Sequence, residues 1–362
     1  MLKKIWRSIG WSFLAAAVLC SGEPASCAAP LDSSIYASLF GSATRHASDE
    51  TIYVVGHMHP DSDAICTAIA YAHLKNAMGI RCEPRANGTI NRETAFVLDY
   101  FHLPVPEILP NAAGKQIILV DHSSYDQSVP EIQHANILEV LDHHNMTDVR
   151  TKTPIFYLSA PVDATSSLVY MIYRSCGIEI PREIAGAMLG SILSDTNNLK
   201  KKGITELDRY AAEDLAKIAG IDDVDGFYRQ MRNAFLNHEG MSVAEIACMD
   251  YKEYTMGNAK VGIGKVVCKD KKEYAELTEA IRRDIVSIHA NRENKMDIFM
   301  ICIVPDHGKE MTLVFDGKMA QEVIEQAFPG GIAGDHSLTF ERSKSSRKKF
   351  LIPQLESVLA NY

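Results

Sequence analysis

The sequence contains no CxxC pair, although it has eight cysteines. Zinc knuckles and thioredoxin-like redox sites need such closely spaced thiols, so both classes are disfavoured. Several of the cysteines lie inside apolar runs, as in Ile301-Cys302-Ile303, and this setting is typical of small buried hydrophobic residues.

A basic excess, an internal repeat and a low-complexity tract are also missing. The formal net charge is −9, whereas a protein that binds nucleic acid non-specifically normally carries a broad basic face. The chain also lacks the aromatic-rich or glycine-rich stretches of single-strand binders. We therefore expect no nucleic-acid partner, and a nuclease is a disfavoured class of enzyme.

The apolar run Ser8–Cys20 is too short to span a bilayer comfortably. It follows a basic start and precedes the small residues Ala25–Ala29, a pattern typical of a signal peptide. We expect residues 1–28 to be that peptide and the mature protein to be periplasmic or secreted, with no stable membrane span. An uncleaved anchor is one alternative. The other is a mis-assigned start, with a cytoplasmic protein that begins nearer Leu31.

A chain of 362 residues exceeds one typical domain, so two hydrophobic cores are expected. From Thr51 onward, continuous apolar strands alternate with helical patterns, which predicts a parallel sheet covered by helices on both faces. A second alternation follows the polar stretch Asn237–Ser242. We predict an α/β fold with a catalytic domain at 45–236, a hinge linker at 237–243 and a smaller C-terminal α/β domain at 244–362.

Three of the predicted strands end in histidine and aspartate. They are Thr51–Val55, followed by His57, Asp61 and Asp63; Gln116–Val120, followed by Asp121; and Ile137–Leu141, followed by Asp142, His143 and His144. Ligands of open α/β sheets gather at the carboxyl ends of the strands, so we expect these clusters to meet at one edge. Asp195, just past a predicted helix at Pro181–Ser194, is expected to join them.

Carboxylates crowded at one edge repel one another unless cations are present. Two divalent ions about 3.5–4 Å apart, bridged by carboxylate, would satisfy them. The mixture of imidazole and carboxylate suits Mn²⁺, Co²⁺ or Zn²⁺ and argues against an all-oxygen Ca²⁺ site. The alternative for any single acid is that it only caps the helix that follows.

Two basic stretches leave two interpretations open. Arg347, Lys348 and Lys349 are either a solvated surface run or a clamp for phosphate oxygens. Lys200, the first of three consecutive lysines just after Asp195, is a further candidate cation.

Taken together, the motifs resemble those of the family II, manganese-dependent inorganic pyrophosphatases of the DHH phosphoesterase superfamily. They run in order from about Ile52 to the C-terminus: Gly56-His57-x-x-Pro60-Asp61-Ser62-Asp63, Val120-Asp121-His122, Asp142-His143-His144, Pro161-Val162-Asp163-Ala164-Thr165-Ser166, Ser194-Asp195 and Ser346-Arg347-Lys348-Lys349. The chain differs from the family pattern at Lys200-Lys201-Lys202-Gly203, where a KSPT-like segment is usual.

The resemblance implies a role for each matched residue. The ligands of two Mn²⁺ or Co²⁺ ions would be His57, Asp61, Asp63, Asp121, His143 and Asp195. His144 would act at the leaving phosphate, Asp142 is a further expected catalytic residue, and Lys200, Arg347 and Lys348 would bind phosphate. It also implies a DHHA2-type C-terminal domain, an active site in the cleft between the domains, a Mg²⁺ ion that enters with the substrate, and a homodimer.

The expected reaction is hydrolysis of pyrophosphate to two phosphates by a hydroxide activated at the two metal ions. A short-chain polyphosphatase that uses the same site is the nearest alternative. A non-catalytic phosphate- or metal-binding protein is a second alternative, although every predicted ligand is present.

Overall fold

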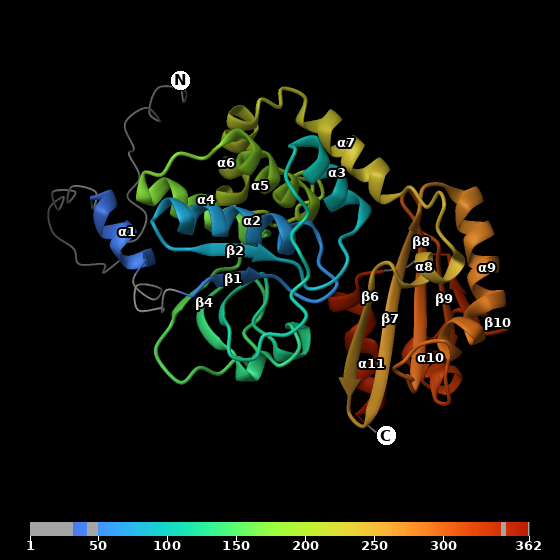
Figure 1. Cartoon of the computed structure of the whole chain (residues 1–362). Helices are drawn as coiled ribbons and strands as arrows, with labels where there is room; N and C mark the ends of the chain where they lie inside the picture. Colours follow the sequence, from blue (N-terminus) through green and yellow to red (C-terminus); the bar gives the residue numbers. More distant parts are fainter. Residues whose placement is uncertain (1–31, 42–49, 342–344, 361) are drawn as a thin grey trace, which may run out of the picture. The chain divides into compact units, whose positions relative to one another are not determined.

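The computed structural model describes residues 32–41, 50–341, 345–360 and 362. These residues form two compact units, one built on a five-stranded sheet and the other on a six-stranded sheet (Figure 1). The predicted signal peptide at 1–28 lies outside the described residues. Within the described ranges, every helix is too short or too polar to cross a membrane.

The sheet of the first unit is entirely parallel, as predicted. Its strands are β1 (Ile52–Val55), β2 (Cys82–Arg85), β3 (Gln116–Val120), β4 (Asn136–Asp142) and β5 (Phe156–Ser159), in the order β2-β1-β3-β4-β5. Parallel strands bring their carboxyl ends to one edge. The three strand ends that carry histidine and aspartate therefore meet there.

Five α-helices accompany this sheet. They are α1 (Ser33–Gly41), α2 (Ser62–Ala77), α4 (Thr165–Cys176), α5 (Arg182–Asp195) and α6 (Glu206–Ala219). Figure 1 shows α2, α4, α5 and α6 together on one side of β1 and β2. Thr205 begins α6 with a capping box that it shares with Asp208, and Gly220 ends the helix in a left-handed conformation with φ +70°.

The second unit has a mixed sheet with helices on both faces. Its strands are β6 (Tyr251–Met256), β7 (Ala259–Cys268), β8 (Ile298–Pro305), β9 (Met311–Asp316), β10 (Ile332–Gly334) and β11 (Ser337–Phe340), in the order β10-β11-β9-β8-β7-β6. Only β7 and β8 pair in parallel among these described strands. The helices of this unit are α3 (Arg92–Tyr100), α7 (Val224–Phe235), α8 (Val243–Cys248), α9 (Lys271–Ala290), α10 (Ala320–Ala327) and α11 (Ile352–Leu359).

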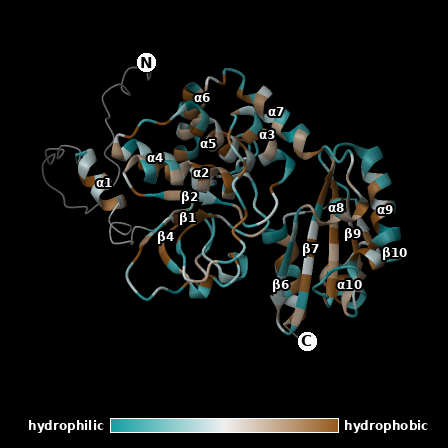
Figure 2. Ribbon diagram, viewed as in Figure 1, coloured by the Kyte–Doolittle hydropathy of each residue, from teal (hydrophilic) through white to brown (hydrophobic). Residues whose placement is uncertain are grey.

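Alternation along β7 divides the second unit into two cores. Val261 and Ile263 pack into the core that includes α10 and α11, whereas Val266 and Cys268 pack into the core that includes α8 and α9. The central strand β8 is buried along its whole length, as expected for a strand covered on both faces. In Figure 2 hydrophilic residues mark the outer side of α9.

The linker predicted at 237–243 connects α7 to α8. The Arg92 guanidinium donates hydrogen bonds to the carbonyl oxygens of Asn237 and Glu239, at 2.9 and 2.8 Å. The role of residues 237–243 as a hinge stays a prediction.

A buried ion pair joins α2 to β4. Lys75 and Glu139 are both fully buried, with Nζ 2.6 Å from Oε1. The Tyr71 hydroxyl donates to the other Glu139 oxygen at 2.7 Å, and Lys75 also donates to the carbonyl oxygen of Phe40 at the end of α1. Burial raises the pKa of Glu139, while Lys75 opposes that rise. The lysine therefore favours the carboxylate form of Glu139 against the effect of burial.

We predict that Lys75→Met destabilises the protein by about 3–5 kcal/mol, because it leaves a buried carboxylate without its cation. The free energy of unfolding, measured by denaturant titration, checks this value. Lys152→Met, at an exposed loop position, is the matched control and should change it by less than about 0.5 kcal/mol. Equal stability of the two variants would contradict a structural role for the pair.

Candidate metal centre

The turn from β1 into α2 carries the first cluster. His57 is 4% exposed, and its Nε2 lies 3.4 Å from Oδ2 of Asp61. Its Nδ1 lies 2.9 Å from the carbonyl oxygen of Met58. A carbonyl only accepts, so Nδ1 carries the proton and Nε2 presents a lone pair. Asp63, in the first turn of α2, is fully buried.

Asp61 caps the helix and also faces the histidine. Its Oδ1 accepts a hydrogen bond from the backbone N–H of Ala64 at 3.1 Å, while Oδ2 faces His57. Helix capping and metal binding are the two roles open to such an acid. Because a carboxylate has two oxygens, the geometry allows both.

Asp121 follows β3 in an unusual backbone conformation. Its φ is +62°, in the left-handed region, and its N–H donates to the carbonyl oxygen of Leu141 at 2.8 Å. The side chain is 1% exposed, and its Oδ1 accepts a hydrogen bond from the Thr165 hydroxyl at 3.0 Å. The strand end, the backbone and a neighbouring hydroxyl together fix this carboxylate.

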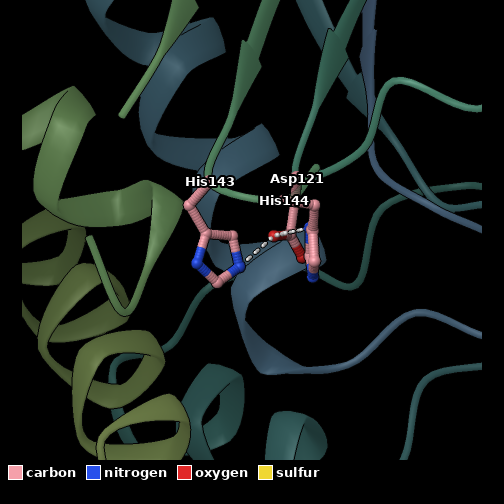
Figure 3. Close-up of side chains that lie close together, drawn as sticks. All are labelled: Asp121, His143 and His144. Atoms are coloured by element: carbon pink, nitrogen blue, oxygen red, sulfur yellow. Dashed lines mark ion pairs between the residues drawn. The ribbon is translucent and has the colours of Figure 1, made fainter. Parts of the chain in front are cut away.

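The two histidines after β4 converge on Asp121 (Figure 3). Nε2 of His143 lies 3.2 Å from Asp121 Oδ1 and 3.8 Å from Oδ2 of Asp195. Nδ1 of His143 lies 3.0 Å from the carbonyl oxygen of Val162, which fixes the same tautomer as in His57. Nδ1 of His144 lies 3.7 Å from Asp121 Oδ1.

Asp142 holds His144 in place. Its Oδ1 accepts hydrogen bonds from the backbone N–H and from Nδ1 of His144, at 2.9 and 3.0 Å. Burial by itself would raise the pKa of Asp142, but the hydrogen bonds from His144 outweigh burial and lower it. Asp142 is therefore an anion that orients the His144 ring.

Asp195 ends α5 just before a left-handed turn. Asn197, Asn198 and Leu199 have φ values of +51°, +55° and +58°. Lys200 follows this turn and is exposed. The neighbouring Lys201 donates to the carbonyl oxygen of Asp195 at 3.1 Å and lies 2.5 Å from Oδ1 of Asp163. The sequence had singled out Lys200, whereas it is Lys201 that contacts the Asp195 backbone.

The six predicted ligands fall into two groups that share no member. Within each group, one ligand atom per residue lies within 4.8 Å of the others. The groups are His57, Asp61 and Asp121, and Asp63, His143 and Asp195. A third group, Asp121, His143 and His144, links the two. Each of the first two groups offers one imidazole nitrogen and two carboxylates, a donor set that fits Mn²⁺ or Co²⁺.

Two further predicted site residues, Arg347 and Lys348, lie near the C-terminus. Arg347 begins a helical turn at Arg347–Leu351, and its Nη2 lies 2.6 Å from Oδ1 of Asp250. Burial would lower the pKa of Arg347, but the Asp250 carboxylate raises it above the ordinary value. Lys348 is exposed.

Comparison with known proteins identifies two matching regions. Residues 51–192 match the DHH family, N-terminal domain, and residues 229–358 match the DHHA2 domain. The manganese-dependent inorganic pyrophosphatase of Methanothrix thermoacetophila is 36% identical over 310 residues, which cover 85% of this chain and 98% of that protein. The Bacillus subtilis protein of the same name is 35% identical over 317 residues, with 86% and 99% coverage.

A solved structure shares the fold. The putative family II inorganic pyrophosphatase of Methanococcus jannaschii superposes with a TM-score of 0.72 at 32% identity, and the match covers 85% of this chain and 99% of that one. The predicted two-domain α/β fold is thereby confirmed.

We predict that Asp121→Asn weakens Mn²⁺ binding by more than about 100-fold, because Asp121 belongs to two of the three groups and changes outside the ligand shell already cost about 10–100-fold. Calorimetric titration of the metal-stripped protein measures the affinity. The exposed Asp126→Asn is the control and should bind Mn²⁺ like the unmodified protein. Unchanged affinity in Asp121→Asn would remove Asp121 from the ligand set.

Proposed function

Because the chain belongs to the family of manganese-dependent inorganic pyrophosphatases, we propose that it hydrolyses pyrophosphate to two phosphates. The observation that carries the proposal is the pair of groups, each with one histidine and two aspartates, that share no member. His57, Asp61, Asp63, Asp121, His143 and Asp195 would hold two Mn²⁺ or Co²⁺ ions. When bound, such ions would lower the pKa of a water molecule and offset the negative charge of the pyrophosphate that this water attacks.

The chain's own groups preorganise this centre. Backbone carbonyls at Met58 and Val162 fix the tautomers of His57 and His143, so both rings present Nε2 without rearrangement. The left-handed backbone at Asp121 aims its carboxylate toward both histidines that follow β4. Little reorganisation is then required when ions and substrate enter.

His144 is proposed to act at the leaving phosphate. Asp142 accepts its Nδ1 hydrogen bond, which leaves Nε2 on the side away from that anchor. The side chain is 29% exposed, enough to meet a substrate oxygen. A proton on Nε2 would be donated to the phosphate as the bridging bond breaks.

Positive side chains would stabilise charge on the phosphates, and a Mg²⁺ ion is proposed to enter with the substrate. Asp250 pairs with the partly buried Arg347 and raises the pKa of its guanidinium, and Lys348 is exposed beside it in the sequence. Lys200 remains a candidate because it follows Asp195 closely and its side chain is exposed.

We predict fast release of phosphate from pyrophosphate by the Mn²⁺-loaded protein with Mg²⁺, and little release from tripolyphosphate. His144→Gln should lower kcat by about 100-fold or more, since a positioned proton donor contributes about 10²–10⁴-fold. The control is His134→Gln, at an exposed histidine that pairs only with Glu131 among its described contacts, and it should leave kcat unchanged.

Other outcomes of this assay have definite meanings. A preference for tripolyphosphate would make the protein a short-chain polyphosphatase. No turnover of either substrate with intact Mn²⁺ binding would leave a binding protein. A raised KM in Lys200→Ala, with Lys201→Ala unchanged, would support Lys200 as the phosphate ligand, and the reverse result would move that role to Lys201.

We also propose that residues 1–28 direct export and that the mature protein is a homodimer. The basic start, short apolar run and small residues of this stretch support export, and the family resemblance supports the dimer. We predict that the full-length protein, produced in a bacterium, is recovered outside the cytoplasm without its first 28 residues. Cytoplasmic recovery of the intact chain would refute export.

For the dimer, sedimentation should give twice the mass of one chain. A monomeric mass would refute the dimer.

A further inference from the structure

The segment that leads from β5 into α4 contacts two of the proposed metal ligands. The Val162 carbonyl accepts the Nδ1 hydrogen bond of His143, and the Thr165 hydroxyl donates to Asp121, both at 3.0 Å. This segment thus sets the tautomer of one ligand and the orientation of another. Any force that holds it in place acts on the metal centre.

That force comes from Asp208, which belongs to α6. Oδ2 of Asp208 accepts the backbone N–H of Asp163 at 3.1 Å, and Oδ1 accepts the Ser167 hydroxyl at 2.6 Å. The same carboxylate accepts the N–H and hydroxyl of Thr205, at 3.2 and 2.5 Å, within the capping box of α6. The Asp208 carboxylate therefore connects the start of α6 to residues on both sides of Thr165.

Asp208 is fully buried, and no lysine, arginine or histidine in the described part of the chain forms an ion pair with it. Among the described contacts, only hydrogen bonds from neutral groups offset the charge of the Asp208 carboxylate. The neutral amide of an asparagine at this position could not accept all of them. A buried anion that has only neutral donors fixes their positions closely, because no cation compensates for a hydrogen bond that is lost. A helix cap by itself needs only the Thr205 contacts.

We propose that Asp208 is a positioning residue for the metal centre and that it acts through the segment 162–167. The inference rests on the metal centre of the proposed function but not on turnover. Asp208 contacts the backbone N–H of Asp163, one residue from the Val162 carbonyl, and the hydroxyl of Ser167, two residues from Thr165. A shift of these anchors moves both contacts with the ligands.

Asp208→Asn tests the proposal by replacing one carboxylate oxygen with an NH₂ group. At the Oδ2 position the NH₂ group cannot accept from the Asp163 N–H, and at the Oδ1 position it forces the Ser167 hydroxyl to accept instead of donate. In calorimetric titrations of the metal-stripped protein without substrate, we expect Mn²⁺ affinity to fall about 10–100-fold, as for other changes beyond the first ligands. The visible absorption of bound Co²⁺ should shift as well.

Thr205→Ala is the matched control for loss of the helix cap. It removes the hydrogen bonds between the Thr205 hydroxyl and Asp208 but leaves those from the backbone N–H of residue 205, from Asp163 and from Ser167. It should therefore lower Tm with unchanged Mn²⁺ affinity. Wild-type affinity in Asp208→Asn would overturn the proposal. Equal weakening in Thr205→Ala would overturn it too, because general destabilisation would then explain both.

A double-mutant cycle tests whether the effect passes through the segment. Thr165→Val removes the hydrogen bond to Asp121, and its combination with Asp208→Asn should weaken Mn²⁺ binding by less than the product of the two single effects. A full product would mean that Asp208 does not act through Thr165 and would refute this route. If Asp208→Asn does not fold, Ser167→Ala takes its place in the cycle, because this variant removes the Ser167 hydrogen bond to Asp208.

The Mn²⁺ titrations need no substrate, so their outcome does not depend on whether the protein hydrolyses pyrophosphate. If pyrophosphate is not a substrate, the proposed function fails while the expected order of Mn²⁺ affinities stands. If the affinities do not follow that order, the role of Asp208 fails whatever the turnover.

Discussion

Mutual repulsion among carboxylates is the constraint on which this structure depends. Asp61, Asp63, Asp121 and Asp195 meet within two small groups at the carboxyl edge of a parallel sheet. Nothing in the hydrophobic effect favours that arrangement, so folding must hold the acids together against their charge. The chain does so with a rigid parallel sheet beneath them, histidines between them and hydrogen bonds that fix each one. Divalent ions held at these groups would relieve the repulsion.

The supporting contacts around the site are made largely by groups without positive charge. Carbonyl oxygens set the histidine tautomers, a threonine hydroxyl holds Asp121, and Asp208 holds the segment that carries that hydroxyl. Lysine or arginine at these positions would compete with the metal ions for the carboxylates. A site that must attract cations is therefore best supported by groups without positive charge, and Lys201 lies at its margin with a side chain that is 40% exposed.

The sequence predicted the elements whose pattern is local. Strands β1, β3 and β4 are continuous apolar runs, and their ends carry the predicted ligands. The parallel sheet and the convergence of His57, Asp121 and His143 therefore followed from the order of residues. Strand β5 was not predicted, because Phe156–Ser159 is a short, half-exposed edge strand without a clear alternation. Helix α1, which precedes the recognised motifs, was not predicted either.

The contacts that depend on backbone direction could not be predicted. The motif that contains Val162 and Thr165 was visible, but which carbonyl faces His143 depends on the path from β5 into α4. Asp208 resembled an ordinary acid in the first turn of a helix, and only its burial beside Ser167 reveals more. Which of the neighbouring residues Lys200 and Lys201 contacts Asp195 depends on the three left-handed residues before them, and the sequence does not reveal that turn.

Helix α1 links the start of the described chain to the interior of the first unit. The carbonyl oxygen of Phe40 accepts from the buried Lys75, and the Phe40 ring meets Phe156 of the edge strand β5 edge-on at 5.4 Å. The region that matches the DHH family begins only at residue 51. A chain shortened to that boundary would lack an acceptor for a buried ammonium group and would bare one side of an aromatic ring. The physical boundary of the domain thus lies upstream of the boundary that family similarity draws, and Phe40 at the end of α1 must be counted as part of its core.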